Sequence, residues 1–339
     1  MQVISLDLRT NLSRGIGVKC RKNVSETGEH SDQTATPVTE DVHQIPNTQD
    51  TESEEVRYVY ILNRVLPPDI RVLAWCPVDP AFTARFSCTS RTYKYFFPRG
   101  NLNLTAMKEA ATALVGEHDF RNLCKMDVGN GVVTFRRYIT AVDLTVGFDK
   151  RTGDDDDDDD DGDGYEICEL TITGQAFLWH QIRCIVTVLF LTGQGRENPA
   201  IVSELLDVER HPRKPQYAMA AEFPLILFDC AYDNDDIEWR RDADSDADTV
   251  RSFQAVWTRH RIRAAMLRRM MSDLGSSARH QTDCLVPGSY CRSYKPLLER
   301  DLCESLEDRI GHYAKKQKLT CNDKKNGNRD TQLDRSDTA

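Results

Sequence analysis

Two short stretches of the chain carry residue types that could act on a nucleic acid base. The first, residues 82–97, is basic and aromatic and contains Phe-Thr-Ala-Arg-Phe and Arg-Thr-Tyr-Lys-Tyr. The second, residues 177–183, reads Phe-Leu-Trp-His-Gln-Ile-Arg and places a single arginine, Arg183, at the end of a largely apolar run. Aromatic rings provide flat surfaces for stacking, and guanidinium groups bind phosphate or carboxylate. Together the two stretches suit the binding of a nucleobase.

The first stretch is expected to be a pair of strands. Residues two apart in a strand project from the same face, so Tyr93 and Tyr95 would lie side by side. A tyrosine pair of this kind most often belongs to a hydrophobic core. The strand pattern alone therefore leaves a binding site and ordinary packing both open.

Six short motifs stand in order along the chain. They are Leu62-Asn63, Leu66-Pro67-Pro68-Asp69-Ile70, Ala84-Arg85-Phe86-Ser87, Arg91-x-Tyr93-x-Tyr95, Gly116-Glu117-His118-Asp119-Phe120 and Phe177-x-x-His180-x-x-Arg183. In this order and spacing they resemble the TruA family of tRNA pseudouridine synthases. Residues 120–127 and 294–307 are similar to its eukaryotic branch, which modifies the anticodon stem-loop at tRNA positions 38 and 39.

The resemblance implies roles for two residues of a reaction centre. Tyr93 matches the family's active-site tyrosine, whose ring stacks on the flipped uracil. Arg183 matches the arginine that pairs with the family's nucleophilic aspartate, a role that suits a planar and permanently charged guanidinium. The alternative for Arg183 is an arginine that extends from a helix to solvent or phosphate.

Four further residues are expected to contact RNA under the same resemblance. Arg85, Arg91 and Lys94 would bind phosphates, and such contacts position a substrate without reading its sequence. His180, which lies one helical turn before the arginine of its motif, would either contact RNA or serve only in packing.

The family's nucleophile is missing from this sequence. In the family the aspartate stands in a Gly-Arg-Thr-Asp-x-Gly-Val segment that leads into a strand beginning Gln-Val. Residues 2–8 fit that strand, so the aspartate is expected before Met1. A truncated gene prediction, an internal start codon or a noncatalytic protein would each give such a chain. Without its partner, Arg183 would be a buried uncompensated charge that lowers stability.

The resemblance implies no cofactor. Pseudouridine formation exchanges the N1–ribose bond of uracil for a C5–ribose bond, with no redox change and no external energy source, so we expect no metal ion and no organic cofactor. Eight consecutive aspartates, Asp154–Asp161, could suggest a cation site. Because like charges packed in sequence repel one another and stay hydrated, we interpret residues 153–164 as a solvated loop instead.

The acidic net charge does not exclude a nucleic acid partner. The formal net charge is −10, and removing the eight aspartates leaves −10 + 8 = −2. The decisive question is whether the basic residues converge on one face. These are Arg85, Arg91, Lys94, Arg136, Arg137 and Arg183.

Composition also bears on the cellular setting. The 11 cysteines form no Cys-x-x-Cys pair, and many lie in apolar runs, which favours buried reduced thiols over disulfides or zinc ligands. No apolar run reaches the roughly 18 residues that span a bilayer, and no signal peptide opens the chain. We expect a protein of the nucleus and cytoplasm with tRNA as its partner. A homodimer, the state of the family's bacterial members, stays open.

Composition divides the chain into six stretches. We expect a residual strand of an N-terminal domain (1–18), a disordered insert (19–55), a catalytic core (56–233), an acidic spacer (234–249), a C-terminal helical extension (250–318) and a disordered tail (319–339). Disorder is predicted where apolar residues are too few to offset the entropy of ordering.

The core is expected to be of the α/β (α+β) class, a mainly antiparallel mixed sheet with helices on one face. The resemblance implies a pseudouridine synthase-like fold that lacks its first strand-helix layer. Strands are predicted at 70–77, 82–97 (two), 136–148, 165–173 and 223–232, helices at 104–115, 177–191 and 198–206, and a short helix or turn at 56–65.

The extension begins with a basic amphipathic helix at 250–274. Its arginines could clamp tRNA phosphates, and an ordinary packing helix with a solvated arginine face is the alternative. The primary functional hypothesis is therefore a tRNA pseudouridine synthase, although this chain by itself is expected to be inactive. The alternatives are a noncatalytic tRNA-binding protein and a nonfunctional fragment.

Overall fold

The computed structural model describes residues 2–12, 15–18, 55–147, 164–233, 237–274 and 293–315. The disordered insert, the aspartate loop and the tail that the sequence predicts lie outside these ranges almost entirely. The described chain divides into two compact units. The first holds Cys88–Tyr232 together with Met1–Val3 and the chain from Ala265 onward, and the second holds Ile4–Ser87 and Asp233–Ala264.

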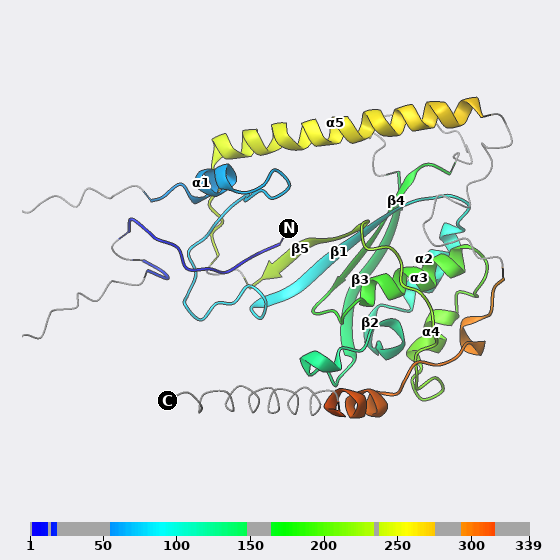
Figure 1. The fold of residues 1–339 in the computed structure, drawn as a ribbon. Helices are drawn as coiled ribbons and strands as arrows, with labels where there is room; N and C mark the ends of the chain where they lie inside the picture. Colours follow the sequence, from blue (N-terminus) through cyan, green and yellow to red (C-terminus); the bar gives the residue numbers. More distant parts are fainter. Residues whose placement is uncertain are drawn as a thin grey trace, which may run out of the picture. The chain divides into compact units, whose positions relative to one another are not determined.

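A five-stranded sheet is the centre of the first unit (Figure 1). Its order is β2-β3-β4-β1-β5, and every neighbouring pair is antiparallel. The predicted antiparallel sheet is therefore confirmed, as is the pairing of the two strands that flank the aspartate loop. The strands are β1 (Cys88–Pro98), β2 (Gly116–Asp119), β3 (Arg136–Val146), β4 (Ile167–Gly174) and β5 (Leu225–Tyr232).

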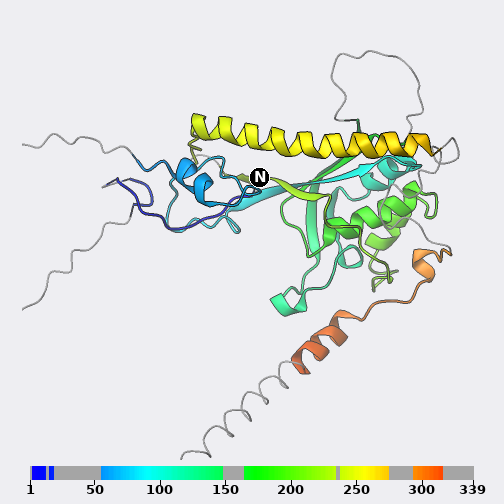
Figure 2. The ribbon, with the colours of Figure 1, turned by 45° about the horizontal axis from the view of Figure 1, so that its top comes forward.

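Three helices cover one face of this sheet, as Figures 1 and 2 both show. They are α2 (Leu104–Thr112), α3 (Gln181–Gly193) and α4 (Ile201–Leu206). The Asn103 side chain caps α2 by accepting a hydrogen bond from the Ala106 N–H at 3.0 Å. Gly193 lets α3 approach α2, because a Cβ there would lie 2.7 Å from the Met107 sulfur.

Alternation along the strands builds the core between sheet and helices. Tyr95 and Phe97 of β1 are buried, and both pack edge-on against Phe190 of α3, with ring centres 6.0 and 5.0 Å apart. Cys168, on the neighbouring strand β4, is also fully buried, and burial raises the pKa of its thiol to about 11. Burial thus keeps the Cys168 thiol protonated.

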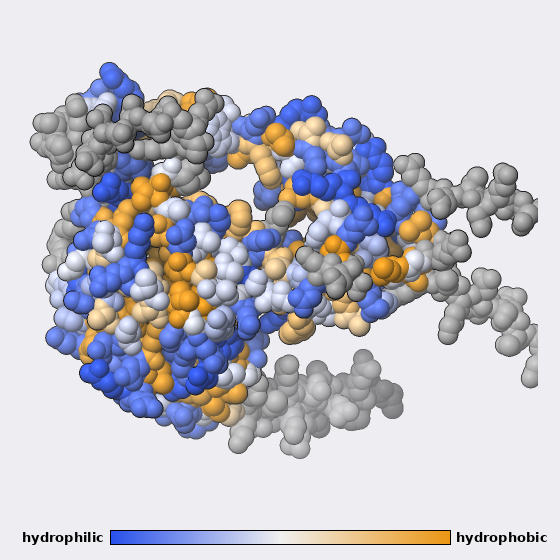
Figure 3. All heavy atoms as spheres, turned by 180° about the vertical axis from the view of Figure 1, so that it is seen from behind, coloured by the Kyte–Doolittle hydropathy of each residue, from blue (hydrophilic) through white to orange (hydrophobic). Residues whose placement is uncertain are grey.

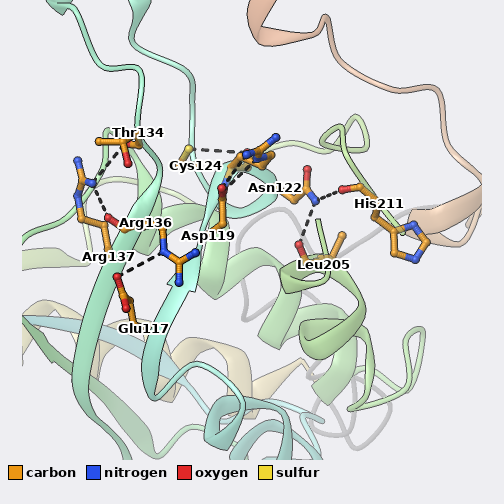
Figure 4. A network of polar contacts seen from close by, with 10 residues as sticks. Glu117, Asp119, Asn122, Cys124, Thr134, Arg136, Arg137, Leu205 and His211 are labelled. Atoms are coloured by element: carbon orange, nitrogen blue, oxygen red, sulfur yellow. Dashed lines mark hydrogen bonds and ion pairs between the residues drawn. The ribbon is translucent and has the colours of Figure 1, made fainter. Parts of the chain in front are cut away.

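The motif at residues 116–120 and the residues after it form framework rather than a reaction centre (Figure 4). Asp119 accepts hydrogen bonds from Nε and Nη2 of Arg121 at 3.1 and 2.7 Å. The buried Asn122 side chain donates to the carbonyl oxygens of Leu205 and His211 at 3.0 and 2.6 Å. The two Asn122 bonds join the chain just after β2 to α4 and to the loop after α4. Arg136 pairs with the exposed Glu117 at 3.4 Å across β2 and β3.

Residues 293–303, which we name the C-terminal strap, pack on the first unit. Leu297 is fully buried, and its N–H donates to Oε1 of Glu197 at 2.7 Å. Tyr294 also donates to Glu197, and burial together with this contact raises the pKa of the Tyr294 hydroxyl. Residues 306–315 then form a helical segment. The similarity to the eukaryotic branch seen at 294–307 thus corresponds to an anchored segment.

The second unit contains α1 (Tyr58–Val65) and most of α5 (Ala243–Asp273). Arg57 binds Asp242 and Asp244 at 2.7 and 3.0 Å, and the Asp242 side chain accepts from the Ser245 N–H at 2.9 Å. That capping bond, with acidic residues in the first turn, explains why α5 begins inside the predicted acidic spacer. The helix predicted at 250–274 thus begins at Ala243, seven residues earlier than predicted.

Helix α5 offers an exposed surface over most of its length. Only Ser245 and Thr249 are buried among its residues. Among its large apolar side chains, Phe253, Trp257 and Met266 are each more than half exposed. Near its end α5 contacts Tyr165, whose ring centre lies 3.6 Å from the Arg268 guanidinium carbon. None of the described helices has the combination of length and apolar character that a membrane crossing requires.

Two predicted strands, at 2–8 and 70–77, are absent from the described residues. Residues 2–10 have no regular structure, and Ile4 and Leu6 are more than half exposed. A strand needs a neighbour for its backbone groups, and no described segment pairs with these residues. At 70–77 the only ladder contact is an isolated bridge between Trp75 and Arg240.

The predicted strand pair at 82–97 is also wrong, because only β1 forms there. Residues 80–87 form turns instead. The Asp79 side chain accepts a hydrogen bond from the Ala81 N–H at 2.7 Å, and the Thr83 hydroxyl accepts one from the Phe86 N–H at 3.2 Å. Such local side-chain bonds compete with strand pairing. The partners of β1 are the distant strands β4 and β5. Seen from behind, the molecule shows separate hydrophobic patches among hydrophilic residues (Figure 3).

Candidate active site

Tyr93 lies on the helix-facing side of β1, as predicted from its spacing to Tyr95. Its register partners are Ile172 of β4 and Leu227 of β5. The ring meets Phe177 edge-on, with ring centres 5.1 Å apart and an interplanar angle of 84°. Burial raises the pKa of the Tyr93 hydroxyl, so this group stays protonated at neutral pH. The Tyr93 ring therefore forms an apolar surface that carries one polar group, its hydroxyl.

The turn before α3 places the other candidate residues. The Leu178 N–H donates to Oε1 of the buried Gln181 at 2.8 Å, and the Gln181 N–H donates back to the Leu178 carbonyl at 3.1 Å. His180 has φ of 57°, the only left-handed conformation of a non-glycine residue in the described chain. Helix α3 consequently starts at Gln181, four residues later than predicted. Strained backbone of this kind concentrates at functional sites.

Arg183 is held by partners that the sequence did not indicate. Its Nε donates to the Ala220 carbonyl at 2.7 Å, and its Nη2 lies 3.1 Å from Oε2 of Glu222. The side chain is 16% exposed, whereas that of Glu222 is 78% exposed. The expectation of an uncompensated charge is therefore wrong. The carbonyl and the carboxylate come from residues 37 and 39 positions further along, and only the fold brings them to α3.

The segment 218–222 joins Arg183 to the tyrosine face of β1. Thr187, one turn after Arg183, donates to the Ala218 carbonyl at 3.0 Å. The Tyr95 hydroxyl donates to the Ala221 carbonyl at 3.1 Å. Burial raises the pKa of Tyr95 to about 12, the Arg183 charge opposes that shift, and Glu222 adds to it. The charges of Arg183 and Glu222 therefore both act on Tyr95, which lies two residues after Tyr93 on β1.

The C-terminal strap binds the chain just before that segment, at residues 214–216. The Cys303 N–H donates to the Lys214 carbonyl at 2.7 Å, and Pro215 and Leu302 form an isolated bridge. The Lys214 ammonium donates to the Cys124 carbonyl at 2.9 Å and to the Cys184 sulfur at 3.1 Å. The chain that carries Ala220 and Glu222 is thus fixed to both α3 and the C-terminal extension.

The predicted phosphate-binding residues do not all come together. Arg91 lies on the Tyr93 side of β1 and donates from Nη1 to the Gln175 carbonyl at 2.8 Å. Lys94 points to the opposite side, where its ammonium pairs with Glu169 at 2.6 Å and lies 4.0 Å from the Phe228 ring centre. Arg85 belongs to the second unit and packs on the Phe86 ring at 5.4 Å.

This placement gives a test of the two neighbouring cations. Arg91→Ala is expected to weaken tRNA binding and to reduce the slope of log affinity against log salt by about one, since one phosphate contact is lost. Lys94→Ala, on the other face of the sheet, is expected to leave both the affinity and the slope unchanged. Fluorescence anisotropy with labelled tRNA at several salt concentrations measures both. An effect of Lys94→Ala equal to that of Arg91→Ala would contradict this placement.

His180 lies among cations. Partial burial and the charges of Arg183, Lys125 and Lys214 lower the pKa of its imidazole. Its Nδ1 lies 3.5 Å from Nη1 of Arg183. The imidazole is therefore neutral at physiological pH in the free protein, and a phosphate group placed here would favour its protonated form. In the described residues we find no cluster of three histidine, cysteine or acidic side chains arranged to hold a metal ion.

Comparison with known proteins identifies relatives of this chain. A family model described as tRNA pseudouridine synthase matches residues 110–233, which include α3 and Arg183. The tRNA pseudouridine(38/39) synthases of Bos taurus and Homo sapiens are 41% and 40% identical over 94% of this chain. The Saccharomyces cerevisiae protein of the same name is 32% identical over 93% of it.

The chain spans 65% of the length of the two mammalian relatives and 63% of the yeast one. The similarity to the two mammalian relatives covers 94% of this sequence. The chain belongs to the TruA family of tRNA pseudouridine synthases, and within it to the eukaryotic branch.

Proposed function

We propose that this protein takes part in the isomerisation of uridine to pseudouridine in the anticodon stem-loop of tRNA. The observation that carries the proposal is the convergence of an aromatic wall and a held arginine. Tyr93 and Phe177 form the wall, and Arg183 enters from α3 beside Tyr95 on the same face of the sheet. The names of the relatives, tRNA pseudouridine(38/39) synthases, support tRNA as the substrate.

Each of these residues has a definite part in the proposed reaction. The Tyr93 ring would pack on the uracil that leaves the base stack, and its protonated hydroxyl would face the polar edge of the base. Arg183 would keep a carboxylate ionised, which favours nucleophilic attack by that carboxylate. Its Nε is fixed by the Ala220 carbonyl, so the guanidinium plane is set before a substrate arrives.

Tritium release tests the proposal. Uridine labelled with tritium at C5 loses the label when C5 becomes bonded to ribose. The assay uses tRNA substrates and the longest protein that the native transcript encodes, because this chain covers 65% of its mammalian relatives. We expect release from an anticodon stem-loop with uridine at position 38 or 39, and no release when both positions carry cytidine.

The same assay distinguishes the noncatalytic alternative. Salt-sensitive tRNA binding without release would favour a tRNA-binding protein, because basic residues near the site would then serve association only. Neither binding nor release would contradict both functions. Helix α5 gives the binding alternative a physical basis, since its arginines Arg259, Arg261 and Arg263 are exposed.

We also propose a cellular location and an assembly state on the basis of the family. A tRNA-modifying enzyme of this branch would act in the nucleus and the cytoplasm. Self-association as a homodimer is proposed from the family's bacterial members, and sedimentation of the purified protein would test it.

A further inference from the structure

The turn that leads into α3 presents an exposed aromatic side chain between two buried residues. Trp179 is 46% exposed, whereas Leu178 before it and Gln181 after it are buried. The direction of Trp179 is set by backbone bonds, because its carbonyl accepts from the Lys125 N–H at 2.9 Å. The left-handed conformation of His180 fixes the turn on the other side.

Cationic and aromatic groups surround this tryptophan. The Lys125 ammonium lies 4.5 Å from the Trp179 ring centre, and the His180 ring lies 4.6 Å away with an interplanar angle of 32°. His180 in turn lies 3.5 Å from Nη1 of Arg183. The exposed ring is thus continuous with the residue proposed to bind the catalytic carboxylate.

This combination is suited to a single-stranded nucleic acid. Exposed aromatic rings held in place beside cations bind bases by stacking and the backbone by charge. Stacking contributes without regard to base identity, because every base has a π-face. A protein partner with acidic side chains would use the cations, but it would gain little from a fixed indole ring at the centre of the cluster.

We propose that Trp179, supported by Lys125 and His180, is a stacking site for an unpaired nucleotide of the RNA that flanks the target uridine. The proposal rests on the proposed function and extends it, because it assigns a second base contact outside the wall formed by Tyr93. A loop nucleotide next to the flipped uridine lies within reach, since His180 joins Trp179 to Arg183.

Alanine substitution tests the proposal by RNA affinity, which needs no catalytic turnover. Trp179→Ala is expected to weaken binding of an anticodon stem-loop RNA by about 5- to 150-fold, the range for loss of one stacked base. The salt slope should stay that of the unaltered protein, because no phosphate contact is lost. Trp179→Phe, which keeps an aromatic face, should restore most of the affinity.

Phe228 provides a matched control in the same unit. It is also 46% exposed with a lysine ammonium over its ring, that of Lys94 at 4.0 Å, but it lies on the opposite side of the sheet from α3. Phe228→Ala is expected to bind the RNA as the unaltered protein does. Thermal unfolding of each variant confirms that the fold is retained.

Three results would overturn the stacking site. The first is an RNA affinity of Trp179→Ala within about twofold of that of the unaltered protein, well below the stacking range. The second is a loss of RNA affinity for Phe228→Ala equal to that for Trp179→Ala. The third is a failure of Trp179→Phe to recover RNA binding. If the unaltered protein binds no RNA at low salt, the proposed function and the stacking site both fail. If the unaltered protein binds RNA and the Trp179 variants bind it with the same affinity, the proposed function stands and the stacking site is rejected.

Discussion

Replacing Arg183 with alanine is expected to lower kcat/KM for pseudouridine formation by about 10²- to 10³-fold, the usual effect of removing one preorganised electrostatic contact from a reaction centre. The guanidinium is fixed by the Ala220 carbonyl at 2.7 Å and is only 16% exposed, so solvent cannot replace it without rearrangement. The measurement is tritium release with the longest protein encoded by the transcript, under single-turnover conditions.

Two further variants define what the arginine contributes. Arg183→Lys keeps a charge but loses the planar donor fork, so it should recover only part of the rate. Glu222→Gln should change the rate by less than about fivefold, because the 78% exposed carboxylate forms a solvent-screened pair. A rate for Arg183→Ala equal to that of Glu222→Gln would show that Arg183 has no part in the reaction.

Replacing Leu297 with alanine is expected to lower the free energy of unfolding by about 2–5 kcal/mol, as for other fully buried leucines. Leu297 is 0% exposed in the core of the first unit, and its backbone N–H is bound to Glu197. Loss of its side chain should also loosen residues 214–222, which the C-terminal strap supports. Urea denaturation followed by circular dichroism gives the first quantity, and amide hydrogen exchange gives the second.

The adjacent leucine is the control for this variant. Leu298 has the same chemistry but is 41% exposed. Leu298→Ala is expected to change the free energy of unfolding by no more than about 0.5 kcal/mol. Equal destabilisation by the two substitutions would mean that the strap does not pack on the core through Leu297.

The regular elements of the first unit were largely predictable from local pattern. Alternating residues indicated β3 and β4, and helical spacing of Met107, Ala110 and Ala111 indicated α2. The start of α3 was not predictable in this way. A left-handed His180 costs energy locally, and only the surrounding contacts impose it.

The second unit departs further from the sequence-based prediction. The apolar alternation at residues 2–8 indicates a strand only if a neighbour pairs with it, and no described residue does so. Conversely, the acidic composition of the residues near Asp242 predicts a spacer, whereas in the structure the Asp242 carboxylate caps the start of α5 and stabilises it. Composition described their charge but not their position in a helix.

The sequence by itself determined the family, the antiparallel sheet, and the candidate roles of Tyr93 and Arg183, because ordered motifs and strand periodicity are properties of the chain alone. The tertiary structure alone decided which residues meet. It placed Lys94 on the far face beside Glu169, and it brought Ala220 and Glu222 to Arg183. Such contacts join residues dozens of positions apart, and packing, not local pattern, selects them.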